Sequence, residues 1–409
     1  MPASIIILIC VIIGIAFRNF IFSSIQIWQI MLLGAITSIF CGSITLKEAV
    51  SSINIEVIIF LVALFFIASA AEECGYLERL AAIIFSKITN IFLMIFAVTF
   101  IMGISSSILL NDTVAIAGTP IMLALFKDDR QVSKIFLMIL AFSITIGSVM
   151  TPTGNPQNLM IALESGMRTP FITMLSRLLV PTLINLLFLT GYMYLIYGKK
   201  LKKVKIKPLC IEKMSRQMKI VNYSVVIFVN LIIATIILEV VQTKLKIPFF
   251  VVPLIATFPI ILCYKNKVKT LKFYDWGTII FFLAMFILMQ SVWISGFFQM
   301  FIKNSQLDMS SNSIIIYVSL ILSQLMSNVP LVSLYLPILH TLNAGISQYM
   351  SLAVGSTIAG NILIIGAASN IIIIQAAENR KSNSFKFFEF AAVGIPLAII
   401  NIIIYLIFI

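Results

Sequence analysis

The sequence predicts an all-α polytopic membrane protein with two inverted repeats, each containing five membrane spans and one re-entrant helical hairpin. Three observations predict this fold class. Hydrophobic residues make up 61% of the chain and charged residues 11%, whereas soluble domains are about half apolar and a quarter charged. Apolar runs of about 20 residues, the length that crosses a bilayer, alternate with short polar breaks. Polar motifs of the first half also recur in the second.

The apolar runs are expected to be helices rather than strands. Residues 57–71, for example, are apolar on every face, whereas strands of a membrane barrel alternate apolar and polar residues. An open sheet is excluded, because its edge would leave backbone groups unpaired in lipid. The ten spans are expected at residues 4–17, 26–42, 55–75, 136–163, 171–197, 221–240, 248–264, 276–298, 351–378 and 388–409.

Two further apolar stretches, residues 90–126 and 312–340, are each interrupted by a polar motif. The interruptions read Asn111-Asp112-Thr113 and Ser327-Asn328-Val329-Pro330. A polar turn at membrane depth is tolerated only where it is buried in protein or lines a cavity. Each stretch is therefore expected to form a helical hairpin that enters and leaves on the same side.

The longest polar segment divides the chain into two halves. We assign residues 1–198 to the first repeat, residues 199–219 to a basic cytoplasmic linker and residues 220–409 to the second repeat. If the linker is cytoplasmic, most of the 28 basic residues fall on the cytoplasmic side, as the positive-inside rule requires. This topology predicts a multi-pass protein of the plasma membrane with both chain ends outside.

The net charge of +13 does not indicate a nucleic-acid-binding protein, because the basic residues lie in loops between spans rather than on one face. The five cysteines form no CxxC pair and predict neither disulfides nor a zinc site. No GxxxxGK[ST] motif is present, so the chain itself is not expected to bind ATP. Glu72 and Glu73 are expected at the cytoplasmic end of the third span.

The two halves repeat the same polar motifs in the same order. Asn111 followed by Thr119-Pro120 in the first half corresponds to Asn328 followed by Leu336-Pro337 in the second. Each half has five full crossings, an odd number, so the second repeat starts on the opposite side and is inverted. Inverted repeats with interrupted helices are typical of secondary transporters.

Four motifs at membrane depth form the candidate binding site. Their glycines and prolines break helices and free backbone carbonyls, and carbonyl and hydroxyl oxygens suit a hard cation such as Na⁺. The N-termini of half-helices suit an anion. Polar contacts that only hold helices together are the alternative for any single motif. The candidate site residues are Asn111, Asp112, Thr113, Thr151, Gly154, Asn155, Asn158, Ser327, Asn328, Gly366, Ser369 and Asn370.

Asp112 is the acid expected deepest in the membrane. A charged carboxylate there costs free energy, so an acid at this depth is taken as a functional residue by default. It is therefore expected to link transport to a cation, as a proton carrier or an ion ligand. An acid that only caps a hairpin arm is the alternative.

At these motifs the sequence resembles the ion transporter superfamily, which includes arsenite-efflux permeases, citrate and dicarboxylate (divalent anion/sodium symporter) carriers and one branch of sodium/proton antiporters. The resemblance extends from about residue 20 to the end. It rests on a hairpin Asn followed by a Gly-x-x-x-Asn loop, a pairing that occurs twice. It implies a homodimer in which one part of each subunit is a scaffold and the other moves like an elevator.

The hairpin tips differ from those of the symporters within this superfamily. Those tips read Ser-Asn-Thr and hold the coupling ion and the substrate carboxylates. Here the tips read Leu110-Asn111-Asp112 and Ser327-Asn328-Val329, so both keep the Asn but neither has Thr directly after it. The Asn-Asp pair followed by Thr119-Pro120 is more similar to the arsenite permeases.

These features predict a secondary active transporter, not an enzyme, that carries a small anion or oxyanion coupled to H⁺ or Na⁺. One alternative is arsenite or antimonite efflux, driven by the membrane potential or by a soluble ATPase partner. Another is sodium/proton antiport, for which a single intramembrane acid argues. The expected partners are the substrate, the bilayer and a second copy of the chain, with no nucleic acid. No cofactor is expected apart from a bound Na⁺.

Overall fold

A computed structural model describes residues 2–21, 25–85, 88–126, 129–201, 213–241, 247–248, 250–265, 270, 274, 276–297, 300, 308–326 and 328–409. Every helix or strand assigned within these ranges is a helix. The predicted all-α membrane fold class is therefore confirmed for this part of the chain.

The helices of the first half include one short interruption of 3-10 type, labelled η1. In chain order they are α1 (Ala3–Ile21), α2 (Ile27–Phe40), α3 (Leu46–Ser51), α4 (Ile55–Glu73), α5 (Tyr76–Phe85), α6 (Ile91–Leu109), α7 (Asn111–Leu125), α8 (Arg130–Gly147), η1 (Ser148–Met150), α9 (Pro156–Glu164) and α10 (Pro170–Leu201).

The second half has two such interruptions, η2 and η3. Its elements are α11 (Arg216–Val240), α12 (Val251–Ala256), α13 (Phe258–Cys263), α15 (Trp276–Ile294), α17 (Asn312–Met326), α18 (Asn328–Thr341), α19 (Ile346–Ile358), η2 (Ala359–Asn361), η3 (Ile364–Gly366), α20 (Ala368–Asn379) and α21 (Phe387–Phe408).

Seven of the described helices have at least 18 residues and are apolar enough to cross a membrane. They are α4, α6, α8 extended by η1, α10, α11, α15 and α21. Polar residues mark where such helices begin. Asn54 accepts a hydrogen bond from the Val57 amide before α4, and Asp129 accepts from Gln131 before α8. These caps satisfy amides that the first helical turn leaves free.

The interrupted segments are divided in the structure, while the re-entry of each hairpin on one side of the membrane stays a prediction. The hairpin stretches become packed helix pairs, α6 with α7 and α17 with α18. The long spans at 136–163 and 351–378 are each divided in two, into α8 and α9 and into α19 and α20. The polar motifs occupy the points of division.

Contacts between helices occur in matched sets in the two halves. In the first half α6 packs on α8, and in the second α17 packs on α19. Across the halves, α7 packs on α20 while α9 packs on α18, and α2 packs on α15 while α4 packs on α12. Exchanging each element for its counterpart reproduces these contacts, as a two-fold relation between repeats would require. The inversion across the membrane stays a prediction.

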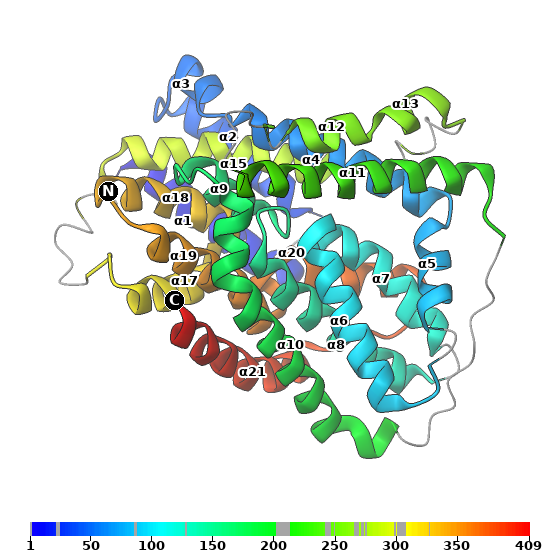
Figure 1. The fold of residues 1–409 in the computed structure, drawn as a ribbon. Coiled ribbons are helices and arrows are strands. Elements are labelled where there is room, and N and C mark those ends of the chain that lie inside the picture. Colours follow the sequence, from blue (N-terminus) through cyan, green and yellow to red (C-terminus); the bar gives the residue numbers. More distant parts are fainter. Residues whose placement is uncertain are drawn as a thin grey trace.

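A pair of asparagines joins the last spans of the two halves. The Asn401 amide in α21 donates to the Asn185 side-chain oxygen in α10 at 2.8 Å, and the two residues are 216 positions apart. Both side chains are fully buried. Figure 1 shows the long helix α10 running diagonally past α21, which it contacts.

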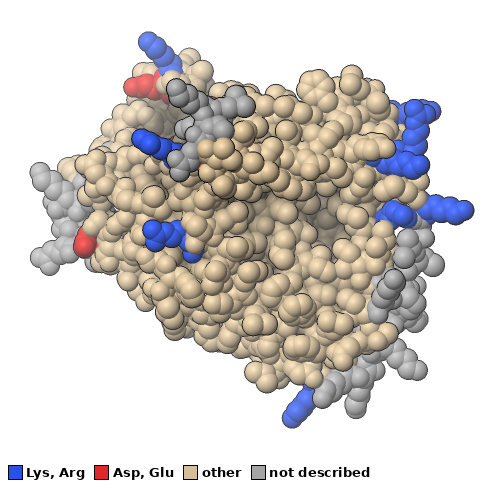
Figure 2. All heavy atoms as spheres, viewed as in Figure 1, with Lys and Arg blue, Asp and Glu red and all other residues tan. Residues whose placement is uncertain are grey.

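Charged side chains are unevenly distributed over the surface. Figure 1 shows α4, α11 and α15 extended along one common direction, with both chain ends toward the left of the view. Figure 2 shows a broad uncharged face and a concentration of Lys and Arg at the right edge, where α11 begins. Basic residues at one end of the spans support a cytoplasmic assignment for that end. The side on which the chain ends lie stays a prediction.

Two short helices were not predicted. Helix α3 lies between the second and third spans and starts with a capping box, in which Thr45 and Glu48 bond each other's backbone amides. Hydrogen bonds from the Thr45 amide and hydroxyl hold the pKa of the Glu48 carboxyl below its usual value. Helix α5, after α4, is amphipathic and contacts α7. The span expected at 248–264 is also divided, at Thr257.

Close packing of α6 on α8 depends on glycine. A Cβ atom on Gly147 would lie 2.0 Å from the Gly103 carbonyl oxygen. We expect Gly147→Ala to force the two helices apart and destabilise the fold by about 1–3 kcal/mol, the usual cost of overpacking. A Cβ atom on Gly191 in α10 would meet no atom within 4 Å, so Gly191→Ala is the matched control. Thermal unfolding of the purified variants measures the difference, and equal unfolding temperatures would contradict the predicted contact.

Candidate functional site

The break between α8 and α9 is held by one asparagine side chain. The Asn158 amide nitrogen donates to the carbonyl oxygens of Ser148 (3.0 Å), Val149 (3.0 Å) and Thr151 (3.1 Å). The Asn155 side-chain oxygen accepts from the Asn158 backbone amide at 2.8 Å and caps α9. A helix break frees carbonyls that lipid cannot satisfy, and Asn158 satisfies three of them inside the protein.

The tip of the first hairpin is bonded to this loop. The Asn111 backbone amide donates to the Gly154 carbonyl oxygen at 2.9 Å. The hydroxyl of Thr153 donates to the Ser107 carbonyl oxygen at 2.8 Å, and that of Thr151 donates to the same oxygen. Two predicted site residues from different motifs therefore lie together, namely Asn111 in the hairpin and Gly154 in the loop.

Leu110 carries an unusual backbone conformation at this tip. Its φ of 67° and ψ of 140° place it in a region that residues other than glycine rarely adopt, at a cost of about 1–3 kcal/mol. Leu110 is fully buried, and the Asn111 bond to the loop holds the turn that follows. Strain of this kind is concentrated at ligand clamps and switch regions.

The second half has a similar arrangement around Asn370. Its side-chain amide donates to the Gly360 carbonyl oxygen at 2.8 Å, and the Gln324 amide donates to the Ala359 oxygen at 2.7 Å. A Cβ atom on Gly366 would lie 2.6 Å from that Ala359 oxygen. The carbonyls freed between α19 and α20 are thus also satisfied by side-chain amides.

Helix α19, in the second half, contacts the loop between α8 and α9 in the first half. The Thr357 hydroxyl lies 3.2 Å from the Asn155 amide nitrogen and 3.3 Å from that of Gln157. These contacts, with those of α7 on α20 and α9 on α18, bring parts of both halves into one buried polar region. Gln157, Thr357 and Gln324 were not among the predicted site residues, although Gln157 and Gln324 lie within the predicted polar motifs.

All predicted site residues that the structure describes are buried, each with at most 9% of its surface exposed. Ser327 lies outside the described residues. The structure joins Asn111 to Gly154, and Asn155 and Asn158 to the same loop. It places Asn328 at the start of α18, the helix that packs on α9. A site shared by Asn111 and Asn328 stays a prediction.

Several site residues have buried side-chain oxygens without a hydrogen-bond partner among the described residues. Such oxygens accept hydrogen bonds from hydroxyl groups or coordinate a cation. Helices α7, α9, α18 and α20 begin within these motifs, and helix N-termini attract anions. The side-chain oxygens without a partner are Thr113 Oγ1, Asn158 Oδ1, Asn328 Oδ1, Ser369 Oγ and Asn370 Oδ1.

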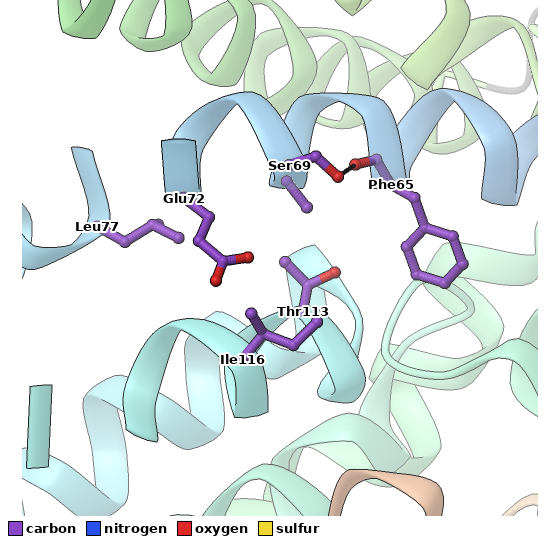
Figure 3. Close-up of a pocket in the computed structure, with 7 residues that line it drawn as sticks. Phe65, Ser69, Glu72, Leu77, Thr113 and Ile116 are labelled. Carbon is purple, nitrogen blue, oxygen red and sulfur yellow. Dashed lines mark hydrogen bonds between the residues drawn. The ribbon is translucent and has the colours of Figure 1, made fainter. Parts of the chain in front are cut away.

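Glu72 faces the hairpin across a small cavity. Figure 3 shows its carboxylate and the Thr113 side chain directed toward the same space between α4 and α7. The sequence indicates only that Glu72 ends an apolar span, and the packing of α4 against α7 brings it to this position.

The sequence profile of the citrate transporter family matches residues 8–351. The chain belongs to the citrate transporter family. This family, together with the relatives below, confirms the predicted resemblance.

Several curated proteins are similar to parts of this chain or to most of it. The transporter arsB of Dictyostelium discoideum is 31% identical over 42% of this chain and 30% of its own length. The silicon efflux transporter LSI3 of Oryza sativa subsp. japonica is 31% identical over 39% of this chain and 33% of its own. The chain thus spans about a third of each. A 46 kDa membrane protein of Mycobacterium leprae is 23% identical over 86% of this chain and 85% of its own.

A solved structure has a similar fold. The YdaH transporter of Alcanivorax borkumensis aligns with a TM-score of 0.56 and 12% identity, over 88% of this chain and 86% of its own. At this identity the similarity concerns the fold alone, and it supports the all-helical architecture.

The two loop asparagines allow a matched test of the polar loops. Asn158 donates to three carbonyls, whereas Asn370 donates to one. A buried acceptor that loses its partner costs about 1–3 kcal/mol, so Asn158→Ala should lower the unfolding temperature more than Asn370→Ala. Thermal unfolding of the purified variants measures both. A larger loss for Asn370→Ala would contradict the role assigned to Asn158.

Proposed function

We propose that the protein is a secondary active transporter that carries a small anion or oxyanion coupled to H⁺ or Na⁺. The observation that carries this proposal is the buried polar region at the two broken helices, where half-helices begin and partnerless oxygens remain. Irregular backbone at membrane depth is characteristic of transporter binding sites. Family membership supports transport but specifies neither the solute nor the coupling ion.

The chemistry of the site assigns different groups to the anion and to the coupling cation. The predicted site residues include no Lys, Arg or His, so an anion would be attracted by the partial positive charge at the starts of α7, α9, α18 and α20. Helix N-termini provide this interaction without a cationic side chain. The partnerless oxygens and the Asp112 carboxylate suit the coupling cation instead.

Arsenite or antimonite efflux is the second candidate function. Arsenous acid is a neutral molecule with three hydroxyl groups near neutral pH, so the partnerless oxygens of Asn158, Ser369 and Asn370 could accept its hydrogen bonds. The similarity to arsB and to a silicon efflux transporter supports this candidate. Such efflux would use the membrane potential or a soluble ATPase partner. The alternative of sodium/proton antiport is supported only by the buried carboxylate of Asp112.

Exchange across proteoliposomes tests the proposed function. Vesicles containing the purified protein would be loaded with citrate, succinate, arsenite or silicic acid and supplied with the same labelled solute outside. We expect exchange of at least one of the anions or oxyacids above protein-free vesicles. Exchange of Na⁺ for H⁺ with no solute exchange would instead support the antiporter alternative and contradict the proposal.

Asp112 is buried at the start of α7, next to the hairpin tip. Asp112→Asn keeps the shape and removes the charge, so gradient-driven accumulation of the exchanged solute should fall about fivefold or more, the lower range of coupling between two sites. Exchange without a gradient should continue. Uptake under imposed H⁺ and Na⁺ gradients measures the change.

Asp129→Asn provides the control for this variant. Asp129 is exposed and caps α8, and Asn caps helices as well as Asp does, so accumulation should equal that of the parent. If Asp112→Asn also accumulates solute like the parent, with the same pH and Na⁺ dependence, then Asp112 is only a cap.

A further inference from the structure

Three asparagine side chains form a hydrogen-bonded chain outside the proposed binding site. The Asn361 amide donates to the Asn401 side-chain oxygen at 3.3 Å, and the Asn401 amide donates to the Asn185 side-chain oxygen at 2.8 Å. All three side chains are fully buried. They come from η2, α21 and α10, so this chain of amides connects the break between α19 and α20 to the last spans of both halves.

The chain of amides ends in the turn that carries the second polar loop. Asn361 belongs to η2, whose carbonyl oxygens accept hydrogen bonds from Gln324 and Asn370. A Cβ atom on Gly394 in α21 would lie 2.0 Å from the Asn361 carbonyl oxygen, so α21 packs directly on η2. Asn401 therefore holds, from α21, the same short turn that the two amides of the second loop bond.

The first loop lacks the matching connection. Asn158 and Asn370 each donate to the carbonyl of the residue ten positions earlier. The residue after that acceptor is Val149 in the first half and Asn361 in the second. Helix α10 packs on η1 as α21 packs on η2, but a valine side chain forms no hydrogen bond. The Asn185 amide nitrogen has no partner among the described residues, so the chain of amides reaches the second loop and not the first.

Stability alone does not account for three buried amides at this place. Burying a polar group costs free energy unless it is hydrogen-bonded. Two atoms of the chain have no partner among the described residues, the Asn185 amide nitrogen and the Asn361 side-chain oxygen. Apolar side chains of the same shape would avoid this cost. A hydrogen bond, unlike an apolar contact, requires a fixed distance and direction, so the amides fix where η2 lies relative to α10 and α21.

We propose that Asn401 is a positioning residue of the transport site, which holds η2, and with it the second polar loop, in place beside the last spans. Asn401 acts through Asn361 rather than on the solute. The two loops are then held differently, the first by the hairpin tip at Gly154 and the second by α21. This inference rests on the proposed function and adds to it a residue that sets the geometry of one of the two loops.

Hydrogen exchange of the purified protein, followed by mass spectrometry, tests the proposal without a solute. Asn401→Leu keeps a similar shape and removes both hydrogen bonds of the side chain. Backbone amides in residues 359–370 should then exchange about fivefold faster, the factor that corresponds to one net hydrogen bond of about 1 kcal/mol. Residues 148–158, the matching loop of the first half, should exchange as in the parent.

Tyr192→Phe is the matched control for this variant. The Tyr192 hydroxyl donates to the Val393 carbonyl oxygen at 3.2 Å, between the same two helices but away from η2. Its loss should leave exchange in both loops unchanged. Equal acceleration of both loops by Asn401→Leu would show a general loss of stability and overturn the proposal, as would exchange like that of the parent in residues 359–370.

Asn361→Leu breaks the same connection at the turn and supplies the measurement if Asn401→Leu does not fold. It should accelerate exchange in residues 359–370 by a similar factor. The double variant should exchange little faster than either single variant, because residues that act through one contact are not additive. Effects that multiply in the double variant would show that Asn361 and Asn401 act independently, which would contradict the proposal.

Transport kinetics separate positioning from a purely structural role. A displaced loop binds the solute less well, so Asn401→Leu should raise KM for the exchanged solute about fivefold, by the same free energy, with a maximal rate close to that of the parent. A purely structural role would lower the amount of folded protein and the maximal rate but leave KM unchanged, and that result would overturn the proposal. If the parent exchanges none of the tested solutes, the proposed function fails, whereas hydrogen exchange still decides whether Asn401 positions the second loop.

Discussion

The rest of the structure depends on one constraint, which is that backbone carbonyls freed by a helix break inside a membrane must be satisfied within the protein. Asn158 meets this constraint in the first half by donating to three carbonyls, and Asn370 and Gln324 meet it in the second. Without these donors, continuous helices would be more stable than broken ones. The broken form is what exposes half-helix N-termini and loop oxygens to a solute.

The same constraint explains why glycine occurs where it does. Gly154 and Gly366 each lie so close to a carbonyl of their own half that a Cβ atom would not fit. The loops are therefore packed against their donors, with side chains excluded, and the Asn111 amide ties the hairpin tip to the first loop. A movement of the hairpin would have to change these few bonds, which would couple hairpin position to the geometry of the binding region.

Much of this arrangement could be predicted from the sequence. Uninterrupted apolar runs identify the long spans, because few other structures bury such segments, and Asn111, Asn158 and Asn370 stand out as polar groups within them. Residues whose role depends on packing could not be predicted. Thr357 contacts Asn155 from the other half of the chain, and Glu72 lines one cavity with Thr113 only because α4 packs beside α7. Short helices such as α3 lack a long periodic signal.

The central claim is that the two halves contribute to one site through their hairpin tips. Spin labels on cysteines at Asn111 and Asn328, in a variant without the native cysteines, would measure this directly by pulsed electron paramagnetic resonance. A shared site predicts a separation below about 20 Å, well inside the hydrocarbon thickness of about 30 Å. A longer distance in every condition, with and without the exchanged solute, would place the tips in separate sites and contradict the account.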